Sequence, residues 1–399
     1  MSRATATNNP LHFLDEALGQ IRADGLYRKL RVLAGEQRPT ARFDSKDVIN
    51  LSSNNYLGLT THPKLREAAL RAVKELGVGS GSVRTIAGTM EIHMELERRI
   101  AAFKKTEASV VFQSGFAANA GTVAAILGKD DLILSDELNH ASIIDGARLS
   151  RATIRVFPHR NPAELGRLLE ETASVKRRLV ITDGVFSMDG DIAPMPEIAA
   201  LARAHGAIMM VDDAHASGVL GQAGRGTVDH FGLHGQVDIQ VGTLSKAIGV
   251  LGGYVAGTRS LIEYLYHRAR PFLFSTSHPP AVAAACIAAF DVLEAEPERI
   301  ERLWSNTKRF KDGLKRLGFN TGMSETPIAP IFVGEADLAM RFSDRLFERG
   351  LFAQGIGYPT VAKGKARLRT IVTATHTEEE LDRALSILEE VGRGLEIIR

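Results

Sequence analysis

The amino-acid sequence predicts an α/β protein with a mainly parallel sheet, followed by a smaller α+β domain. From about residue 62 to residue 290, short β-branched runs alternate with helical stretches, a pattern typical of a parallel sheet with right-handed crossovers. The clearest strands are nearly all apolar, as expected of strands that helices cover on both faces. These strands are Ser109–Phe112, Leu132–Leu134, Leu179–Thr182 and Ile208–Val211. After residue 290 the pattern changes, and this change predicts the second domain.

Three segments follow from these patterns: residues 1–50, a large domain at 51–290, and a small domain at 291–399. The first segment holds an amphipathic helix and its exit within residues 11–35, and a short strand, Asp47–Leu51. In the small domain, the last helix begins with Thr377 and Glu380 at the spacing of a capping box. The other elements predicted there are, in order, a charged helix from Pro297 to about Leu317, the strand Pro327–Phe332, the helix Ala336–Glu348 and the alternating strand Ala366–Val372.

The composition limits the classes of protein. The 399 residues are 44% apolar and 24% charged, with a net charge of +2, which is ordinary for a globular enzyme. Basic and acidic residues are interspersed, so the sequence has no footprint of nucleic-acid binding. The one cysteine, Cys286, lies in an alanine-rich run and is expected to be a buried, inert thiol. Neither a signal core within Met1–Gly19 nor a membrane-spanning stretch is evident, so we expect no membrane association and a cytoplasmic location.

Polar, turn-forming residues follow five of the strand-like runs. In parallel sheets, ligands bind beyond the carboxyl ends of the strands, and five such turns at one edge indicate a site. The turns are Ser114–Phe116, Ser135–His140, Asp183–Gly190, Asp212–His215 and Thr243–Lys246.

Lys246 is the most informative of these residues, because a strand delivers it to a Gly/Ser/Thr turn. A lysine held there can lose water, lower its pKa and act as an amine nucleophile, so it could hold an aldehyde cofactor as an imine. Asp212 would be costly to bury unpaired, and a protonated pyridine nitrogen is a natural partner. His215 could donate to a phenolate oxygen on the same ring, and His140 could stack over it.

Ser114, Gly115 and Phe116 open a helix, and the N-terminus of a helix offers N–H groups and a positive dipole end to a phosphate. Thr243 can add a hydroxyl. Each of these residues alone is more simply read as a turn, a cap or a structural histidine. Together, His140, Asp212 and His215 could also bind a metal, which leaves a metal-dependent hydrolase as an alternative from another class. His230 and His234 are expected in a surface loop, and we predict no metal site.

Six motifs resemble the α-oxoamine synthases, enzymes that depend on pyridoxal 5′-phosphate (PLP). The resemblance runs from about Asp15 to the end of the chain. The motifs are Ser53-Asn54-Asn55-Tyr56-Leu57-Gly58, Asn139-His140-Ala141-Ser142, Gly184-Val185-Phe186-Ser187-Met188-Asp189-Gly190, Val211-Asp212-Asp213-Ala214-His215, Gly242-Thr243-Leu244-Ser245-Lys246 and Ala366-Arg367-Leu368-Arg369. The resemblance implies fold type I: a large domain with a mainly parallel, seven-stranded sheet, and a homodimer whose sites lie at the interface.

The resemblance also implies roles for individual residues. Lys246, His140, Asp212 and His215 would be catalytic, with Lys246 joined to PLP. The further PLP-binding residues would be Ser114, Gly115, Phe116, Ser187 and Thr243, with Ser275 and Thr276 from a second subunit. Arg369 would bind the carboxylate of the amino acid, a bidentate task suited to a guanidinium. Besides His140 and Ser187, the remaining substrate-binding candidates are Asn55, Thr360 and Arg28, the last for acyl-CoA.

The implied reaction is the condensation of a small amino acid with an acyl-CoA. The segments at 139–146, 183–190 and 363–367 favour glycine and acetyl-CoA giving 2-amino-3-oxobutanoate and CoA, the reaction of glycine C-acetyltransferase (2-amino-3-ketobutyrate CoA ligase). The alternative within the family is 8-amino-7-oxononanoate synthase, which joins alanine to a pimeloyl thioester with loss of the carboxylate.

Overall fold

The central element is a seven-stranded sheet with the strand order β4-β10-β9-β8-β7-β5-β6. The computed structural model describes residues 9–24, 27 and 29–399. Strand β10 is antiparallel to both of its neighbours, and the other pairs are parallel. The strands are β4 (Ala108–Phe112), β5 (Leu132–Asp136), β6 (Thr153–Phe157), β7 (Arg178–Asp183), β8 (Ile208–Asp212), β9 (Ile239–Thr243) and β10 (Gly253–Gly257). The α/β, mainly parallel fold is thereby confirmed.

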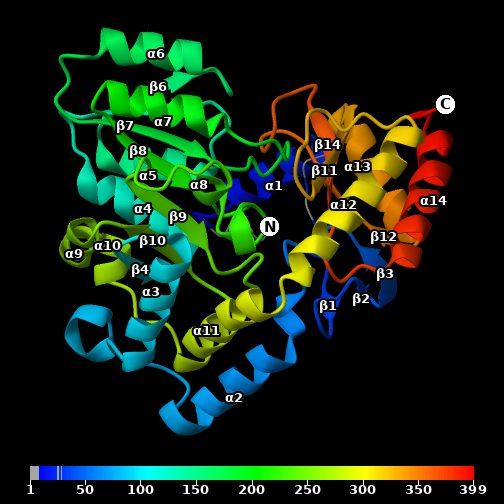
Figure 1. Cartoon of the computed structure of the whole chain (residues 1–399). Coiled ribbons are helices and arrows are strands. Elements are labelled where there is room, and N and C mark those ends of the chain that lie inside the picture. The colour runs from blue at the N-terminus through cyan, green and yellow to red at the C-terminus, as the bar shows by residue number, and fades with distance from the viewer. Residues whose placement is uncertain (1–8, 25–26, 28) are drawn as a thin grey trace, which may run out of the picture.

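Helices cover both faces of this sheet (Figure 1). Along β7, Leu179 and Ile181 pack with α4, α5, α9 and α10, whereas Val180 packs with α6 and α7 on the other face. Burial on both faces explains why the strands read as continuous apolar runs. The helices of this part are α2 (Pro63–Leu76), α3 (Glu91–Lys104), α4 (Gly115–Ile126), α5 (Ala141–Ser150), α6 (Pro162–Glu171), α7 (Met195–Ala204), α8 (Thr227–His230), α9 (Arg259–Arg268), α10 (Arg270–Leu273) and α11 (Pro280–Ala295).

The C-terminal part is an α+β unit, on the right in Figure 1. Its three-stranded antiparallel sheet has the order β11-β14-β13. The predicted capping box forms at the last helix, where Thr377 Oγ1 accepts from Glu380 N–H at 3.2 Å and Glu380 Oε2 accepts from Thr377 N–H at 2.9 Å. Its elements are α12 (Glu298–Arg316), β11 (Ile328–Gly334), α13 (Ala336–Glu348), β13 (Gln354–Ile356), β14 (Ala366–Ile371) and α14 (Glu378–Gly394).

The N-terminal segment begins with helix α1 (Phe13–Ala23), which has no buried residue. Three short strands follow: β1 (Leu33–Ala34), β2 (Thr40–Phe43) and β3 (Lys46–Asn50). Strand β3 pairs in parallel with β12 (Leu351–Phe352), so this segment shares a sheet and a core with the C-terminal part. Helix α11 runs across residue 290. The division into three segments stays a prediction.

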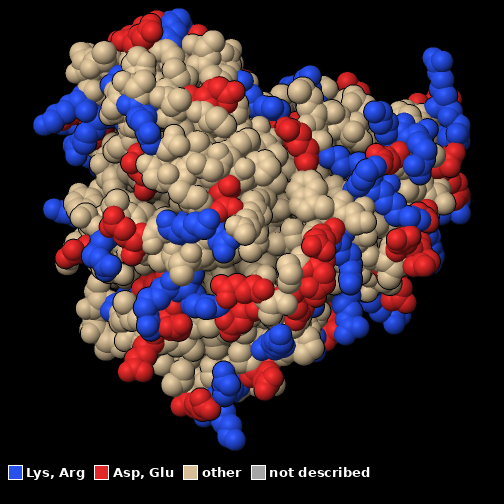
Figure 2. Space-filling model, in the orientation of Figure 1, with Lys and Arg blue, Asp and Glu red and all other residues tan. Residues whose placement is uncertain are grey.

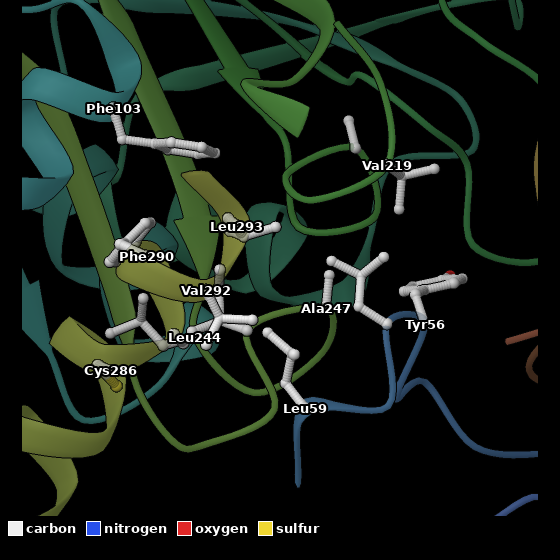
Figure 3. Packing of buried hydrophobic residues seen from close by; sticks show 14 of the residues in the cluster. Tyr56, Leu59, Phe103, Val219, Leu244, Ala247, Cys286, Phe290, Val292 and Leu293 are labelled. Atoms are coloured by element: carbon white, nitrogen blue, oxygen red, sulfur yellow. The ribbon is translucent and has the colours of Figure 1, made fainter. Parts of the chain in front are cut away.

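One hydrophobic cluster anchors the turn that carries Lys246 (Figure 3). Leu244 and Ala247, on either side of the lysine, are buried with Tyr56 and Phe290 in this cluster. Cys286 belongs to it too and is fully buried, which raises the pKa of its thiol to about 12. The expectation of a buried thiol is confirmed, and the lysine turn is fixed in a packed core.

Lysine, arginine, aspartate and glutamate are mixed over the face shown in Figure 2, and no large area carries one sign of charge. Within the described ranges, no helix is both long and apolar enough to cross a membrane. A cytoplasmic location stays a prediction.

Candidate active site

The predicted turns meet in one cavity of about 170 Å³ at the carboxyl edge of the seven-stranded sheet. Strands β4, β5, β7, β8 and β9 run in the same direction, so the residues that follow them meet at one edge. The cavity is lined by Ser114, Gly115, Phe116, His140, Ser142, Asp183, Ser187, Asp212, Ala214, His215, Thr243, Ser245 and Lys246. The candidate residues from positions 114–116 to 246, far apart in the chain, therefore line one cavity.

Lys246 follows β9, and the protein around it changes the chemistry of its amine. Burial lowers the pKa of Lys246 to about 8, against the opposing effect of Asp212, and Arg369 lowers it further. An amine with this pKa is partly unprotonated near neutral pH, which nucleophilic attack and proton transfer both require.

Asp212 ends β8 with its carboxylate inside the protein, where the residue is 4% exposed. Asp212 Oδ2 accepts from Asn119 Nδ2 at 2.6 Å, and Oδ1 accepts from Ala214 N–H at 2.8 Å. Both donors are neutral, and within the described part of the chain no basic side chain forms an ion pair with this carboxylate. A buried carboxylate with only neutral donors is suited to a cationic ligand atom. Asn119, on α4, was missed in the sequence because nothing local links it to Asp212.

His215 is held from behind by a tyrosine that sequence reasoning also missed as a partner. Tyr56 Oη lies 2.7 Å from His215 Nδ1, and both residues are buried. Burial, and then the nearby Lys246 and Arg369, lower the pKa of His215 well below its ordinary value. The imidazole is therefore neutral. In the tautomer in which the phenol donates to Nδ1, Nε2 carries the proton and can donate to a ligand.

His140 is the N-cap residue of α5 and lines the cavity. Its N–H donates to Asp183 Oδ2 at 2.8 Å, and its Nδ1 lies 2.8 Å from Ser142 Oγ. Ser142 Oγ in turn accepts from Asn119 Nδ2 at 2.9 Å, so His140 and Asp212 share one hydrogen-bond network. Loss of solvent around the ring lowers the pKa of His140, which favours the neutral form.

The N-terminus of α4 faces the same cavity. Ser114 caps the helix, its Oγ accepting from Ala117 N–H at 3.1 Å, and the first-turn N–H groups have no partner within the helix. A Cβ on Gly253 would lie 2.3 Å from Ser114 O, and one on Gly115 would lie 3.4 Å from Thr243 Cβ. Glycines thus bring the helix start against β9 and β10. Thr243 Oγ1 lies 2.7 Å from Ser245 Oγ and donates to Gly252 O at 2.9 Å. These hydroxyls and the free N–H groups of the helix start line the cavity together, an arrangement suited to an anion.

Arg369, on β14, reaches the site from the C-terminal unit. Its Nε donates to Ser187 O at 2.5 Å, and both Nη atoms lie 3.3 Å from Asn54 Oδ1. The guanidinium lines a second cavity, of about 260 Å³. Asn54, which the sequence did not single out, contacts the arginine. Asn55 Oδ1 accepts from Thr60 N–H at 3.3 Å, and the substrate-binding role of Asn55 stays a prediction.

Three other candidates do not line either cavity. Thr360 is exposed in the turn after β13, where its N–H donates to Gly357 O at 3.0 Å. Ser275 and Thr276 lie beyond α10, and Thr276 O accepts from Gln113 Nε2 at 2.6 Å. Their assignment to the site of a second subunit stays a prediction. Arg28 lies outside the described residues.

The residues present fit PLP. They offer an amine with a lowered pKa at Lys246, a buried carboxylate at Asp212 whose hydrogen-bond donors in the described part of the chain are neutral, and the N–H groups at the start of α4. Across the described ranges, no group of three or more His, Cys, Asp or Glu residues is arranged to hold a metal ion. His234, expected in a surface loop, hydrogen-bonds Asp229 at 2.9 Å. The fold and the site define a PLP-dependent enzyme of fold type I.

The comparisons with known proteins agree with this class. A family model described as aminotransferase class I and II matches residues 46–388. The chain is 60% identical to the 8-amino-7-oxononanoate synthase of Symbiobacterium thermophilum, over 97% of this chain and 99% of that protein. It is 57% identical to 8-amino-7-oxononanoate synthase 1 of Bacillus subtilis, over 97% and 98% of the two chains.

Solved structures also support this class of enzyme. A serine palmitoyltransferase from S. paucimobilis with bound PLP and myriocin superposes with a TM-score of 0.93 at 32% identity, covering 98% of this chain and 100% of that one. The 8-amino-7-oxononanoate synthase of Francisella tularensis has a TM-score of 0.75 at 28% identity, covering 87% and 98%. The chain belongs to the PLP-dependent α-oxoamine synthase family and is an enzyme of the acyltransferase type.

The relatives change the ranking of substrates. The sequence segments favour glycine and acetyl-CoA, but the relatives at about 60% identity are named 8-amino-7-oxononanoate synthase. The comparisons therefore support the alternative within the family better than glycine C-acetyltransferase.

Proposed function

We propose that this enzyme is an 8-amino-7-oxononanoate synthase, which condenses alanine with a pimeloyl thioester and releases carbon dioxide and the thiol. The observation that carries the proposal is the identity of 60% to the relative from S. thermophilum over nearly the whole of both chains. The arrangement of Lys246, Asp212, His215 and Arg369 around the two cavities supports it.

PLP bound at this site supplies an aldehyde that condenses with an amine, and a protonated ring that accepts electron density from the Cα of the amino acid. Asp212 would hold a proton on the ring nitrogen, because a cation would stabilise its buried carboxylate. His215 would contact the ring oxygen and His140 the face of the ring, and the N-terminus of α4 would hold the phosphate beside Thr243.

Lys246 and Arg369 act on the amino acid itself. The pKa of Lys246, at about 8, suits it to take the Cα proton and to return a proton later. Arg369 holds the substrate carboxylate through its two Nη atoms, which Asn54 orients from one side. The Cα then forms a bond to the thioester carbonyl carbon, the thiol leaves, and the carboxylate departs as carbon dioxide.

The proposal includes a homodimer with Ser275 and Thr276 of each chain at the other chain's site. Thr276 is exposed in the single chain, as is Phe274 beside it, whose exposed fraction is 70%. An exposed phenylalanine next to a polar pair is consistent with a buried position in an assembly.

The experiment compares two substrate pairs with the purified PLP-loaded enzyme. Thiol release is measured with alanine plus pimeloyl-CoA and with glycine plus acetyl-CoA, and carbon dioxide is trapped from carboxyl-labelled alanine. We expect turnover of the alanine pair with one labelled carbon dioxide per thiol. Turnover of the glycine pair alone would contradict the proposed substrate and favour glycine C-acetyltransferase.

A further inference from the structure

A lysine and an aspartate form an enclosed ion pair directly behind the cofactor cavity. Lys104 Nζ lies 2.8 Å from Asp213 Oδ2, and the exposed fraction of both side chains is 0%. Lys104 also donates to Arg225 O at 2.6 Å. Burial alone would lower the pKa of Lys104, but Asp213 outweighs this effect and raises the pKa, so the lysine keeps its proton. Neither side chain lines the cavity.

The backbone closes around this pair. Thr227 N–H donates to Asp213 Oδ2 at 3.1 Å, and its hydroxyl donates to Oδ1 at 2.5 Å. A Cβ on Gly226 would lie 2.0 Å from Asp213 Oδ2, and one on Gly184 would lie 2.6 Å from Oδ1. Gly226 has a φ of 101°, in the left-handed region where a side chain is strained. Two glycines therefore bring the main chain close enough to surround the carboxylate.

Stability alone does not account for the ion pair. Removing two charges from water is costly, and an apolar pair of similar volume is often as stable or more so. The position of Asp213 gives a better reason for a buried ion pair here, because this residue directly follows Asp212 and precedes His215 by two residues. Its N–H donates to Val241 O at 2.8 Å, and its carbonyl accepts from Ala216 and Ser217 N–H at 3.0 and 2.8 Å. Main chain and side chain of Asp213 together fix the turn that presents both cofactor contacts.

Lys104, the other member of the ion pair, is held by a packed helix. Lys104 is the last residue of α3, and Phe103 beside it packs against Phe290 of α11 with ring centroids 5.0 Å apart. Figure 3 shows both rings in the cluster that also holds Leu244 and Ala247 of the lysine turn. Lys104 therefore connects the Asp212–His215 turn to the same hydrophobic core that positions Lys246.

We propose that Lys104 and Asp213 are positioning residues, which hold the Asp212 carboxylate and the His215 imidazole in the orientation that binds and keeps protonated the PLP ring. The inference depends on the PLP site and not on the choice of substrates. Its readouts use PLP alone, so its failure and the failure of the proposed function are distinguishable.

The test measures the dissociation constant of PLP for the apoenzyme of Asp213→Asn and Lys104→Met. At a temperature where circular dichroism shows each variant folded, we expect about a tenfold or larger increase, the size expected when one hydrogen bond to a charged group is lost. The second readout is the 15N chemical shift of labelled pyridine nitrogen in the bound PLP. It should report a protonated ring in the wild-type enzyme at pH 8 and a partly deprotonated ring in the variants.

The matched control is Asp131→Asn. Asp131 is also a buried carboxylate, 4% exposed, paired with Arg177 at 2.9 Å, but it precedes β5 at the opposite edge of the sheet. This variant should lower thermal stability while leaving both PLP readouts as in the wild type. If Asp213→Asn or Lys104→Met does not fold, Thr227→Val serves instead, because it keeps the ion pair and removes the hydrogen bond from the Thr227 hydroxyl to Asp213. We then expect about a threefold increase in the PLP dissociation constant. Wild-type values of both readouts in the folded variants, or an equal change in Asp131→Asn, would overturn the proposal.

Discussion

The contact between Tyr56 and His215 allows a sharp test of how the site is held. The substitution Tyr56→Phe removes only the hydroxyl, which lies 2.7 Å from His215 Nδ1. Tyr56 is 1% exposed and His215 is 7% exposed, so water cannot readily replace the lost partner. The aromatic ring remains, and the packing of the cluster in Figure 3 is kept.

The size of the effect follows from burial. A buried polar atom that loses its partner costs about 1–3 kcal/mol, so the free energy of unfolding of the apoenzyme should fall by this amount. The effect on PLP adds to it. Among the described residues the Tyr56 hydroxyl is the hydrogen-bond partner of His215 Nδ1, and in the tautomer in which the phenol donates, the proton of the neutral imidazole is on Nε2. Without the phenol, the proton can move to Nδ1, and Nε2 no longer donates to the ring oxygen.

Two assays separate these effects. Urea denaturation of the apoenzyme measures stability, and fluorescence titration with PLP measures the dissociation constant, which should rise about tenfold for a loss of about 1.4 kcal/mol. Tyr254→Phe is the matched control, because Tyr254 is equally buried and its hydroxyl lies 2.7 Å from Ser217 Oγ. The control should lose stability to a similar degree, with a PLP dissociation constant within about threefold of the wild type. Equal PLP affinities of Tyr56→Phe and the wild type would refute the reasoning.

Three further predictions concern the charges of the site and of the sheet edge. Asp212→Asn keeps the shape but loses the charge that we propose pairs with the ring nitrogen, and turnover at saturating PLP should fall about 10²–10³-fold. A variant as active as the wild type would contradict this role of the carboxylate. Arg369→Lys replaces a bidentate donor by a single ammonium, so steady-state kinetics should show KM for the amino acid rising about tenfold with a smaller change in kcat; an unchanged KM would place the carboxylate elsewhere. His159 bridges Asp136 at 2.9 Å and Asp191 at 2.8 Å; burial opposes its charge, but these hydrogen bonds raise its pKa from 6.5 to about 9. The stabilisation from His159 is therefore fully present below about pH 6.5 and is lost as the pH rises through about 9. In urea denaturation, the free energy of unfolding of the wild type should fall by about 3 kcal/mol more than that of His159→Gln over this range. Parallel pH profiles of the two proteins would contradict this role of His159.

Much of the large sheet could be predicted because burial on both faces leaves a clear signal in the sequence. Strands β7 and β8 are continuous apolar runs. Strand β6 gives no such run, since it is an edge strand with several exposed residues. Strand β10 contains two glycines. It pairs with β4, more than a hundred residues away in the sequence, and with β9, about ten residues away. The pairing of β3 with β12 joins residues about 300 positions apart, and no local pattern specifies it.

The cavity residues could be predicted for a related reason. Asp212 ends a strand, and Lys246, His140 and Ser114 each follow one; parallel strands bring such residues together at one edge. The residues that hold them could not be found in this way. The partners Asn119, Tyr56 and Lys104 lie 93, 159 and 109 positions from the residues they bind, and each is an ordinary helix or turn residue in its own segment. Only the folded chain shows these contacts.

The most direct test of the account is to locate the covalent bond to PLP. The enzyme is incubated with PLP, reduced with borohydride, digested and analysed by mass spectrometry. The account predicts one pyridoxyl-phosphate group per chain, on the peptide that contains Lys246, and none at that peptide in Lys246→Ala. A modified peptide that contains another lysine, or an unmodified protein that retains full activity, would contradict it.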